Sequence, residues 1–262
     1  MIVFFMVAFG IPWTTWIVLR MKHVAFPEGT LAFTLSTAFC SAGGVVATYI
    51  ANGRSGLKEL AHRCVLYRVP VAWWLYALFL APAVHAVATV IYGTAHGRVG
   101  PVRPMELFHQ WWLFYMFLFI LFQGPLAEEL AWRGFLLPRL LGKCSPLRAS
   151  MILGVVWAAW HINVFFSPIS TWALFTASAV ALSILMTVLF LHTHGSVLLA
   201  IVMHWSVIPG KHIVRTLFPV SQEPPDGLRA AVVITVSVIM VAIMGRKLSA
   251  AAPHNPNTAA LS

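Results

Sequence analysis

Long apolar runs, separated by short polar or Pro- and Gly-containing stretches, recur along the whole chain. Runs of about 20 apolar residues suit transmembrane helices, whereas the strands of a membrane barrel would show alternating runs of about ten residues. We therefore expect an all-α, polytopic membrane helical bundle. The pattern predicts about eight spans, at Ile2–Leu19, Leu31–Ala51, Val71–Tyr92, Leu107–Ala127, Arg148–Phe166, Ser170–Leu191, Ser196–Ile208 and Leu228–Gly245.

The segments between and within these runs carry further expectations. The seventh span is short and is expected to stop at Pro209-Gly210, which suits a helix packed inside the bundle. Adjacent Gly43 and Gly44 indicate a close helix contact, with simple flexibility as the alternative. The stretch 52–70 is predicted to be a basic loop. Residues 251–262, rich in Ala, Pro and Asn, are predicted to form a disordered tail.

The composition supports a membrane protein and argues against a soluble one. The chain is 60% hydrophobic and 9% charged, whereas soluble domains average roughly 45–50% apolar and about 25% charged residues. The net charge of +10 would suggest nucleic acid in a soluble protein. Here Lys and Arg stand in the loops, where they meet membrane lipid headgroups, so we expect no nucleic-acid partner. The three cysteines show neither metal-ligand spacing nor a disulfide framework.

Two adjacent carboxylates, Glu128 and Glu129, follow the fourth predicted span, and Arg133 stands four residues after Glu129. Ionisable groups are costly in membrane segments and mark candidate functional sites. Helical residues four apart share a face, so Glu129 and Arg133 are predicted to pair. Glu128 lies about 100° round the helix, without a cation in that register, which makes it a candidate general base. The alternative is a buried ion network that only fixes helix packing.

Two later spans each contribute one histidine. His161 follows Trp157 by one helical turn, and His204 lies in the short seventh span. With Glu128, these histidines predict an inward-facing site between helices of the bundle. Such a set can bind a metal ion, with zinc as the candidate and Glu128, His161 and His204 as ligands. It can equally act without metal, with Glu128 as the base and the histidines as donors to a developing oxyanion.

The order and spacing of these motifs resemble the CPBP family (CAAX proteases and bacteriocin-processing enzymes, also called Abi), in particular its Rce1-like intramembrane endopeptidases. The motifs are Glu128-Glu129-x-x-x-Arg133, the aromatic-x-x-x-His of Trp157 to His161, and His204 in a span that follows Thr-His-Gly-Ser. The resemblance covers roughly residues 105–210, which we take as a protease-like core within a single integral membrane domain, 1–262.

The resemblance implies roles for individual residues. Glu128 would activate the hydrolytic water, His161 and His204 would be catalytic, and Glu129 and Arg133 would support them. It also implies a peptide or lipidated protein substrate, such as a prenylated CAAX peptide, and a multi-pass protein of the inner or plasma membrane. A metalloprotease mechanism and a metal-free glutamate mechanism both stay open, because no His-Glu-x-x-His sequence makes zinc compelling.

One position departs from the family pattern. The family usually has Asn or Asp four residues after the last histidine, as an oxyanion partner, and here that residue is Ile208. Ser206 and Asn163 each follow a histidine by only two residues, about 200° round a helix, so they are poor substitutes. Loss of one oxyanion donor costs roughly 10²–10³ in rate in other enzymes.

Three functions are compatible with the sequence. The first is an intramembrane endopeptidase with Glu128, His161 and His204 as its catalytic residues. The second is a catalytically weak or inactive membrane protein of the same fold that binds a partner, for example in immunity, and Ile208 supports it. The third is a proton-coupled transporter, against which the sequence shows neither an inverted repeat nor a matching pair of interrupted spans.

Overall fold

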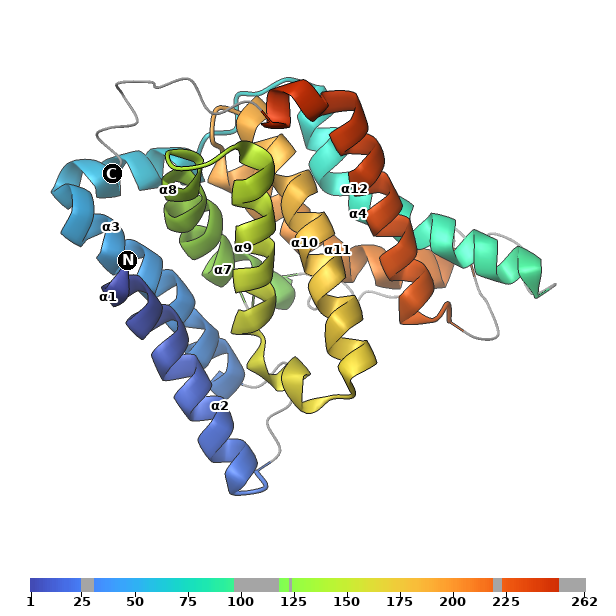
Figure 1. The fold of residues 1–262 in the computed structure, drawn as a ribbon, viewed down its shortest axis with the longest axis horizontal. Helices are drawn as coiled ribbons and strands as arrows, with labels where there is room; N and C mark the ends of the chain where they lie inside the picture. The colour runs from blue at the N-terminus through green and yellow to red at the C-terminus, as the bar shows by residue number, and fades with distance from the viewer. Residues whose placement is uncertain (25–30, 97–117, 123, 219–222, 250–262) are drawn as a thin grey trace.

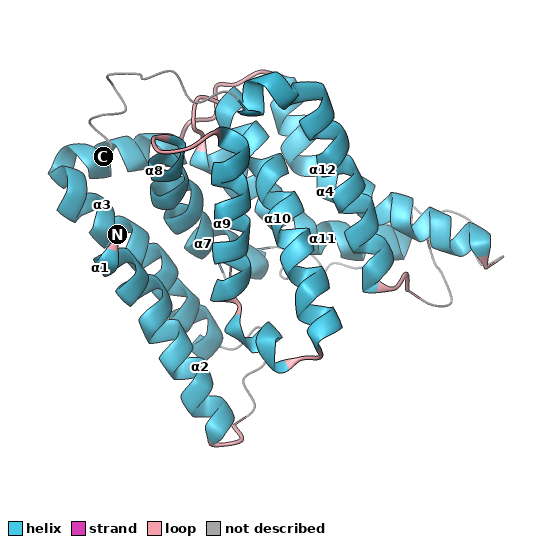
Figure 2. Cartoon of the chain, in the orientation of Figure 1, coloured by secondary structure: helices cyan, strands magenta, loops and turns pink. Residues whose placement is uncertain are grey.

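The computed structural model describes residues 1–24, 31–96, 118–122, 124–218 and 223–249. These residues form helices joined by short loops and contain no strand, so the all-α prediction is confirmed for them (Figure 2). The predicted tail, 251–262, and most of the predicted fourth span lie outside the described residues. The elements are α1 (Ile2–Phe5), η1 (Met6–Gly10), α2 (Ile11–Met21), α3 (Leu31–Cys64), α4 (Val71–Ala95), α7 (Pro125–Ala131), η2 (Trp132–Leu136), α8 (Leu137–Leu141), α9 (Pro146–Trp160), η3 (Ile162–Phe166), α10 (Ile169–His192), α11 (Val197–Leu217) and α12 (Asp226–Ser249).

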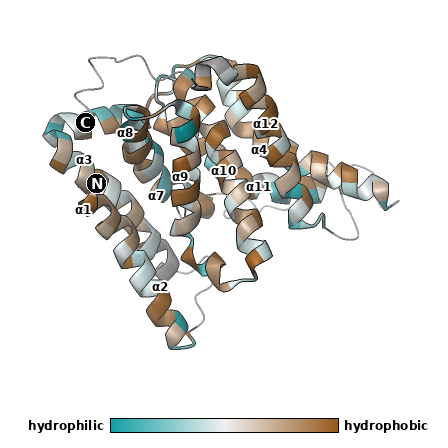
Figure 3. Cartoon of the chain, in the orientation of Figure 1, coloured by the Kyte–Doolittle hydropathy of each residue, from teal (hydrophilic) through white to brown (hydrophobic). Residues whose placement is uncertain are grey.

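Within the described residues, five helical segments are long and apolar enough to cross a membrane, fewer than the eight spans predicted. The predicted second span lies in α3, which is not among the five, and the predicted fifth corresponds to α9, a shorter apolar helix of 15 residues. Hydrophobic residues dominate the helices of the bundle (Figure 3). The protein is thus a multi-pass membrane protein. The five segments are Ile2–Met21, Val71–Ala95, Ile169–His192, Val197–Leu217 and Asp226–Gly245.

Helix α3 continues through most of the predicted basic loop, so that prediction is wrong. The chain bends at Gly53, whose φ of 59° favours glycine, and helical structure then resumes to Cys64. The resumed part brings in Arg63, which donates hydrogen bonds to the carbonyls of Arg133 and Gly195, both at 2.8 Å. Burial lowers the pKa of Arg63 to about 10, so its guanidinium remains charged at neutral pH. These contacts tie α3 to the segments that carry Arg133 and the start of α11.

Glycines 43 and 44 bring α3 against two different neighbours, which confirms the predicted close helix contact. A Cβ built on Gly43 would lie 2.8 Å from the Cβ of Ala8 in η1. A Cβ built on Gly44 would lie 2.8 Å from the Cα of Ala131 in α7. Small residues allow backbones to approach this closely in membrane bundles. Helix α3 therefore holds the N-terminal helix on one side and the helix of the glutamate pair on the other (Figure 1).

The helix that carries the glutamates continues to Leu141 and ends at Gly142. Its middle part, η2, is π-helical, a local widening that is frequent at functional sites. Residues 132–137 are all buried, including Trp132 and Arg133. The side chain of Ser41 on α3 donates to the carbonyl of Ala127 at 2.5 Å. The glutamate pair is thus carried by a buried, tightly held helix.

Helix α11 does not stop at Pro209-Gly210 but continues to Leu217, so the predicted end is wrong. Proline is tolerated within membrane helices where a neighbouring helix accommodates the interruption. Here α4 does so, because a Cβ on Gly210 would lie 2.8 Å from the ring of Pro82. The His85 ring also bonds the Val207 carbonyl at 3.1 Å, through Nε2.

A loop residue, Glu223, joins the end of α11 to the start of α12. Its carboxylate contacts Arg215 and Arg229, both at 2.8 Å, and Lys211 at 3.4 Å. Burial alone would raise the pKa of Glu223, but the hydrogen bond from Arg229 and the charge of Lys211 outweigh it and keep the pKa below its usual value. The four side chains therefore form an ion-pair cluster that stays charged at neutral pH.

The N-terminal helix holds the end of α9 through two tryptophans. The Trp13 indole donates to the Trp160 carbonyl at 3.0 Å, and the Trp160 indole donates to the Ala8 carbonyl at 2.9 Å. Ala8 lies in η1, a second π-helical segment. Because His161 directly follows Trp160, these bonds fix the backbone at the point where α9 ends.

We expect Trp13→Phe to lower the free energy of unfolding by about 1 kcal/mol, because it removes one indole donor and keeps an aromatic ring. Trp74→Phe is the matched control, since its indole donates to the Tyr67 carbonyl at an exposed position and its loss should cost less. Unfolding of both purified variants in detergent measures the difference. Equal stabilities of the two variants would show that the Trp13 bond contributes little.

Candidate active site

The three predicted catalytic residues line one cavity of about 340 Å³. Glu128 comes from α7, His161 follows the last residue of α9, and His204 comes from α11. The structure therefore brings together three side chains that are far apart in the sequence. The remaining lining is Ile120, Gly124, Pro125, Trp157, Phe175, Ser178, Ala179, Leu182, Val207 and Ile208.

Glu129 and Arg133 form the predicted pair behind this cavity. Arg133 Nη1 donates to both oxygens of Glu129, at 2.9 and 3.0 Å, and both side chains are fully buried. The guanidinium also lies over the ring of Trp157, 4.9 Å from its centroid. A buried charge is strongly destabilising once its partner is removed. Loss of either Glu129 or Arg133 should therefore destabilise the fold.

His204 contacts Glu129 and not Glu128. Its Nδ1 lies 2.8 Å from Glu129 Oε1. A carboxylate can only accept, so His204 Nδ1 carries the proton. Glu129 thereby fixes the orientation of the His204 ring and leaves Nε2 as the ring nitrogen that is not bound to Glu129.

Glu128 is buried, and its carboxylate is held by two indoles. Trp132 Nε1 donates to Oε2 at 3.2 Å, and Trp157 Nε1 donates to the same oxygen at 2.5 Å. Hydrogen bonds to the ionised form favour it, so Glu128 is held as a carboxylate. This is the protonation state that a general base requires.

The ring of His161 is held by a backbone carbonyl one helical turn earlier in α9. Its Nδ1 lies 3.0 Å from the Trp157 carbonyl, which can only accept, so Nδ1 carries a proton. The ring packs edge-on against Trp160 and Phe175, with ring centroids 4.9 and 5.0 Å away. In the neutral ring, Nε2 is therefore a proton acceptor, and in the protonated ring it is a donor.

No polar side chain takes the place of the family's Asn or Asp among the described cavity-lining residues next to His204. Ile208 itself lines the cavity and is 46% exposed. Ser206 is buried and donates to the Met203 carbonyl at 2.8 Å. Asn163 lines a neighbouring cavity instead. The apolar substitution therefore lies inside the candidate site.

The proposed metal ligands do not fit a metal ion in the described part of the chain. No group of three His, Cys, Asp or Glu side chains there is placed to hold one. His204 Nδ1 binds Glu129 and Oε2 of Glu128 binds two indoles, so these two residues would have only Nε2 and Oε1 to offer a metal ion. Zinc thus lacks a ligand set in these residues.

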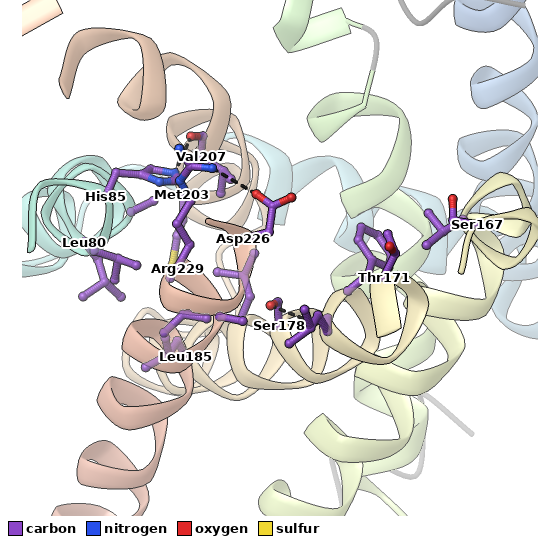
Figure 4. Close-up of a pocket in the computed structure, with 18 of the residues that line it drawn as sticks. Leu80, His85, Ser167, Thr171, Ser178, Leu185, Met203, Val207, Asp226 and Arg229 are labelled. Atoms are coloured by element: carbon purple, nitrogen blue, oxygen red, sulfur yellow. Dashed lines mark hydrogen bonds and ion pairs between the residues drawn. The ribbon is translucent and has the colours of Figure 1, made fainter. Parts of the chain in front are cut away.

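A second cavity, of about 480 Å³, adjoins the first between α4, α10, α11 and α12 (Figure 4). Both are lined by Phe175, Ser178, Leu182 and Val207. Most of its wall is apolar, and the ion pair of Asp226 and Arg229, at 2.9 Å, stands between the labelled residues of α4 and α10. The two cavities together offer apolar space beside the three candidate catalytic residues.

The indole donors were missed by the sequence analysis, although a signal for one of them was present. Trp132 is four residues after Glu128, so the helical spacing that predicted the pair of Glu129 and Arg133 also predicts this contact. Trp157 was recognised only as the aromatic residue before His161, and its bond to Glu128 spans 29 positions. Such long-range contacts have no local signal.

Comparisons with known proteins agree with the motifs. Residues 110–207 match the family model of the type II CAAX prenyl endopeptidases, Rce1-like. The CAAX prenyl protease 2 of Methanococcus maripaludis is 29% identical over 101 residues, which span 34% of this chain and 37% of that protein. The match therefore covers little more than a third of the relative's length. The residues matched by the family model include the glutamate pair, Arg133, His161 and His204, and the resemblance to Rce1-like CAAX prenyl endopeptidases is thereby confirmed for residues 110–207.

Proposed function

We propose that the protein is an intramembrane endopeptidase that hydrolyses peptide bonds of membrane-associated substrates, with Glu128 activating water. One observation carries the proposal. Glu128, His161 and His204 line one cavity, while Glu129 forms the ion pair with the buried Arg133. The pair of adjacent carboxylates is thus divided into one that faces the cavity and one that supports His204.

The arrangement suits a metal-free hydrolysis. A water in the cavity loses a proton to the Glu128 carboxylate, and its oxygen forms a bond with the substrate carbonyl carbon. We assign to His204, whose ring is held by Glu129, the donation of a hydrogen bond from Nε2 to the oxyanion that develops, a step that requires the protonated ring. When the C–N bond breaks, the proton passes to the leaving amine. His161 Nε2, in the same cavity, is available to relay it.

We place the protein in the cell's inner or plasma membrane. The match to prenyl endopeptidases makes prenylated CAAX peptides the first substrate class to test. Purified protein in liposomes is given a fluorogenic prenylated peptide and the same peptide without the lipid. We expect cleavage of the lipidated peptide by the wild type and none by Glu128→Gln, with the cut located by mass spectrometry. Absence of cleavage of either peptide by the wild type, or full activity in Glu128→Gln, would contradict the proposal.

A zinc chelator separates the two mechanisms. A glutamate protease keeps its activity in the chelator. Activity that is lost in chelator and restored by zinc would show a metal enzyme, whose ligands would have to include groups beyond the described set.

Ile208 favours a second candidate function, a membrane protein of the same fold that binds a partner without cutting it. The missing donor lies in the cavity wall, at the position where the sequence departs from the family's Asn or Asp. This candidate predicts that partner binding survives Glu128→Gln and that the wild type shows no cleavage at all.

For the endopeptidase, we expect Ile208→Asn to raise kcat by about tenfold or more, because one oxyanion donor is worth roughly 10²–10³ in other enzymes. Ile208→Val is the matched control, since it keeps the apolar wall and should leave kcat unchanged. Cleavage of the lipidated peptide measures both. An unchanged or lower rate in Ile208→Asn would show that the side chain at this position does not reach the oxyanion.

A further inference from the structure

We propose that Gly124 is a positioning residue for the reaction: it keeps open the place of the attacking water at Oε1 of Glu128, while Trp132 and Trp157 hold Oε2. The proposal rests on the endopeptidase function proposed above. It assigns different tasks to the two oxygens of one carboxylate. It also gives a task to a residue without a side chain, which none of the motifs includes.

The two oxygens of Glu128 are not equivalent. Both indole hydrogen bonds fall on Oε2, from Trp132 at 3.2 Å and from Trp157 at 2.5 Å. The residue is buried, so these bonds are made away from bulk water and hold Oε2 in place. Oε1 is left as the oxygen with lone pairs available to a water.

Gly124 lies beside this second oxygen. A Cβ built on Gly124 would lie 3.2 Å from Glu128 Oε1, and no other described atom outside the neighbouring residues lies within 4 Å of it. Gly124 and Glu128 both line the 340 Å³ cavity. The space next to Oε1 is therefore open toward the cavity because residue 124 has no side chain.

The position matches what the reaction needs. A water that donates to a carboxylate oxygen lies about 2.7 Å from it. A methyl carbon 3.2 Å from Oε1 would occupy the same shell and exclude that water. In the step itself, one O–H bond of water breaks, the proton goes to Oε1, and the oxygen electron pair forms the bond to the carbonyl carbon.

The local backbone explains how the glycine comes to this place. Gly124 directly precedes Pro125, the first residue of α7, and its carbonyl accepts from the Glu128 amide at 2.7 Å. This bond is the first turn of α7, so residue 124 stands one turn before Glu128. The same geometry that starts the helix therefore places residue 124 beside the carboxylate.

The test is Gly124→Ala in liposomes with the lipidated peptide. We expect kcat to fall by at least tenfold while KM stays within about twofold, because the methyl displaces water and not the peptide. Gly142→Ala is the matched control. Gly142 ends α8 with right-handed backbone angles, and a Cβ there would make only ordinary contacts, the nearest at 3.7 Å. It should retain the wild-type kcat. A kcat of Gly124→Ala within threefold of the control overturns the proposal.

Chemical rescue separates loss of the water's place from a displaced glutamate. Glu128→Gly with added formate supplies a free carboxylate, and we expect part of the activity to return. The double variant with Gly124→Ala should recover at least tenfold less. Equal recovery would show that the methyl acts only by moving Glu128, which contradicts the proposal. If formate rescues neither variant, the comparison of Gly124→Ala with Gly142→Ala decides.

The outcomes also distinguish this proposal from the function on which it rests. A wild type without cleavage, or Glu128→Gln with full activity, removes the endopeptidase itself. If the wild type is active, Glu128→Gln is inactive and Gly124→Ala is unaffected, the endopeptidase function stands and only the role of Gly124 is contradicted.

Discussion

Glu128→Gln is expected to lose at least about a thousandfold in kcat, within the roughly 10²–10⁴ range that general bases contribute, while the protein stays folded. The retained fold follows from the geometry of the carboxylate. Both indole bonds fall on Oε2, so a glutamine can place its carbonyl oxygen there and accept both. Its amide group then faces the cavity and cannot take a proton from water.

The control for this variant is Glu59→Gln, which neutralises an exposed glutamate on α3. Initial rates of peptide cleavage and unfolding in detergent are measured for both variants. We expect the two variants to be equally stable. Only Glu59→Gln should retain cleavage activity. A Glu128→Gln protein that is inactive and also unfolded would indicate that the carboxylate is structural, as in a buried ion network.

Arg133→Met is expected to lower the free energy of unfolding by about 3–5 kcal/mol, because it leaves a buried carboxylate without its cation. Glu129 would keep only the His204 contact, at 2.8 Å. The double variant Arg133→Met/Glu129→Gln removes both charges, and we expect it to be more stable than Arg133→Met alone. This sign distinguishes an ion pair from two independent side chains, whose losses would add.

Unfolding of these variants in mixed micelles gives the required free energies. Arg139→Met is the control for loss of an arginine that is only partly buried, where Nη1 binds a carbonyl and Nη2 binds Asn52. It should cost clearly less than Arg133→Met. If the double variant is less stable than Arg133→Met, Glu129 stabilises the bundle by contacts other than its charge.

The sequence predicted the parts of the site that follow from local helix geometry. The spacing of Glu129 and Arg133 predicted their pairing, and the apolar runs predicted helices at α4, α10 and α12. Gly43-Gly44 also predicted a close approach, because small residues allow helix backbones to pack closely in membranes.

The remaining features depend on contacts between distant segments. Pro209 reads as a helix end, yet α11 continues because Pro82 and His85 of α4 lie against it. The partner of His204 proved to be Glu129, 75 positions away, which no spacing rule could have chosen over Glu128. The π-helical segment η2 likewise has no sequence signature that the pattern of apolar residues reveals.

The two hydrogen bonds between the N-terminal helix and Trp160 limit how the candidate site can be transferred to another protein. The segment that resembles prenyl endopeptidases begins at residue 110, but the backbone before His161 is secured from Ala8 and Trp13. Residues 110–207 therefore do not contain all the contacts that hold the candidate site in place. A chimera that joins residues 110–207 to a foreign first helix would include Glu128, His161 and His204 and still lack the contacts that hold the backbone before His161.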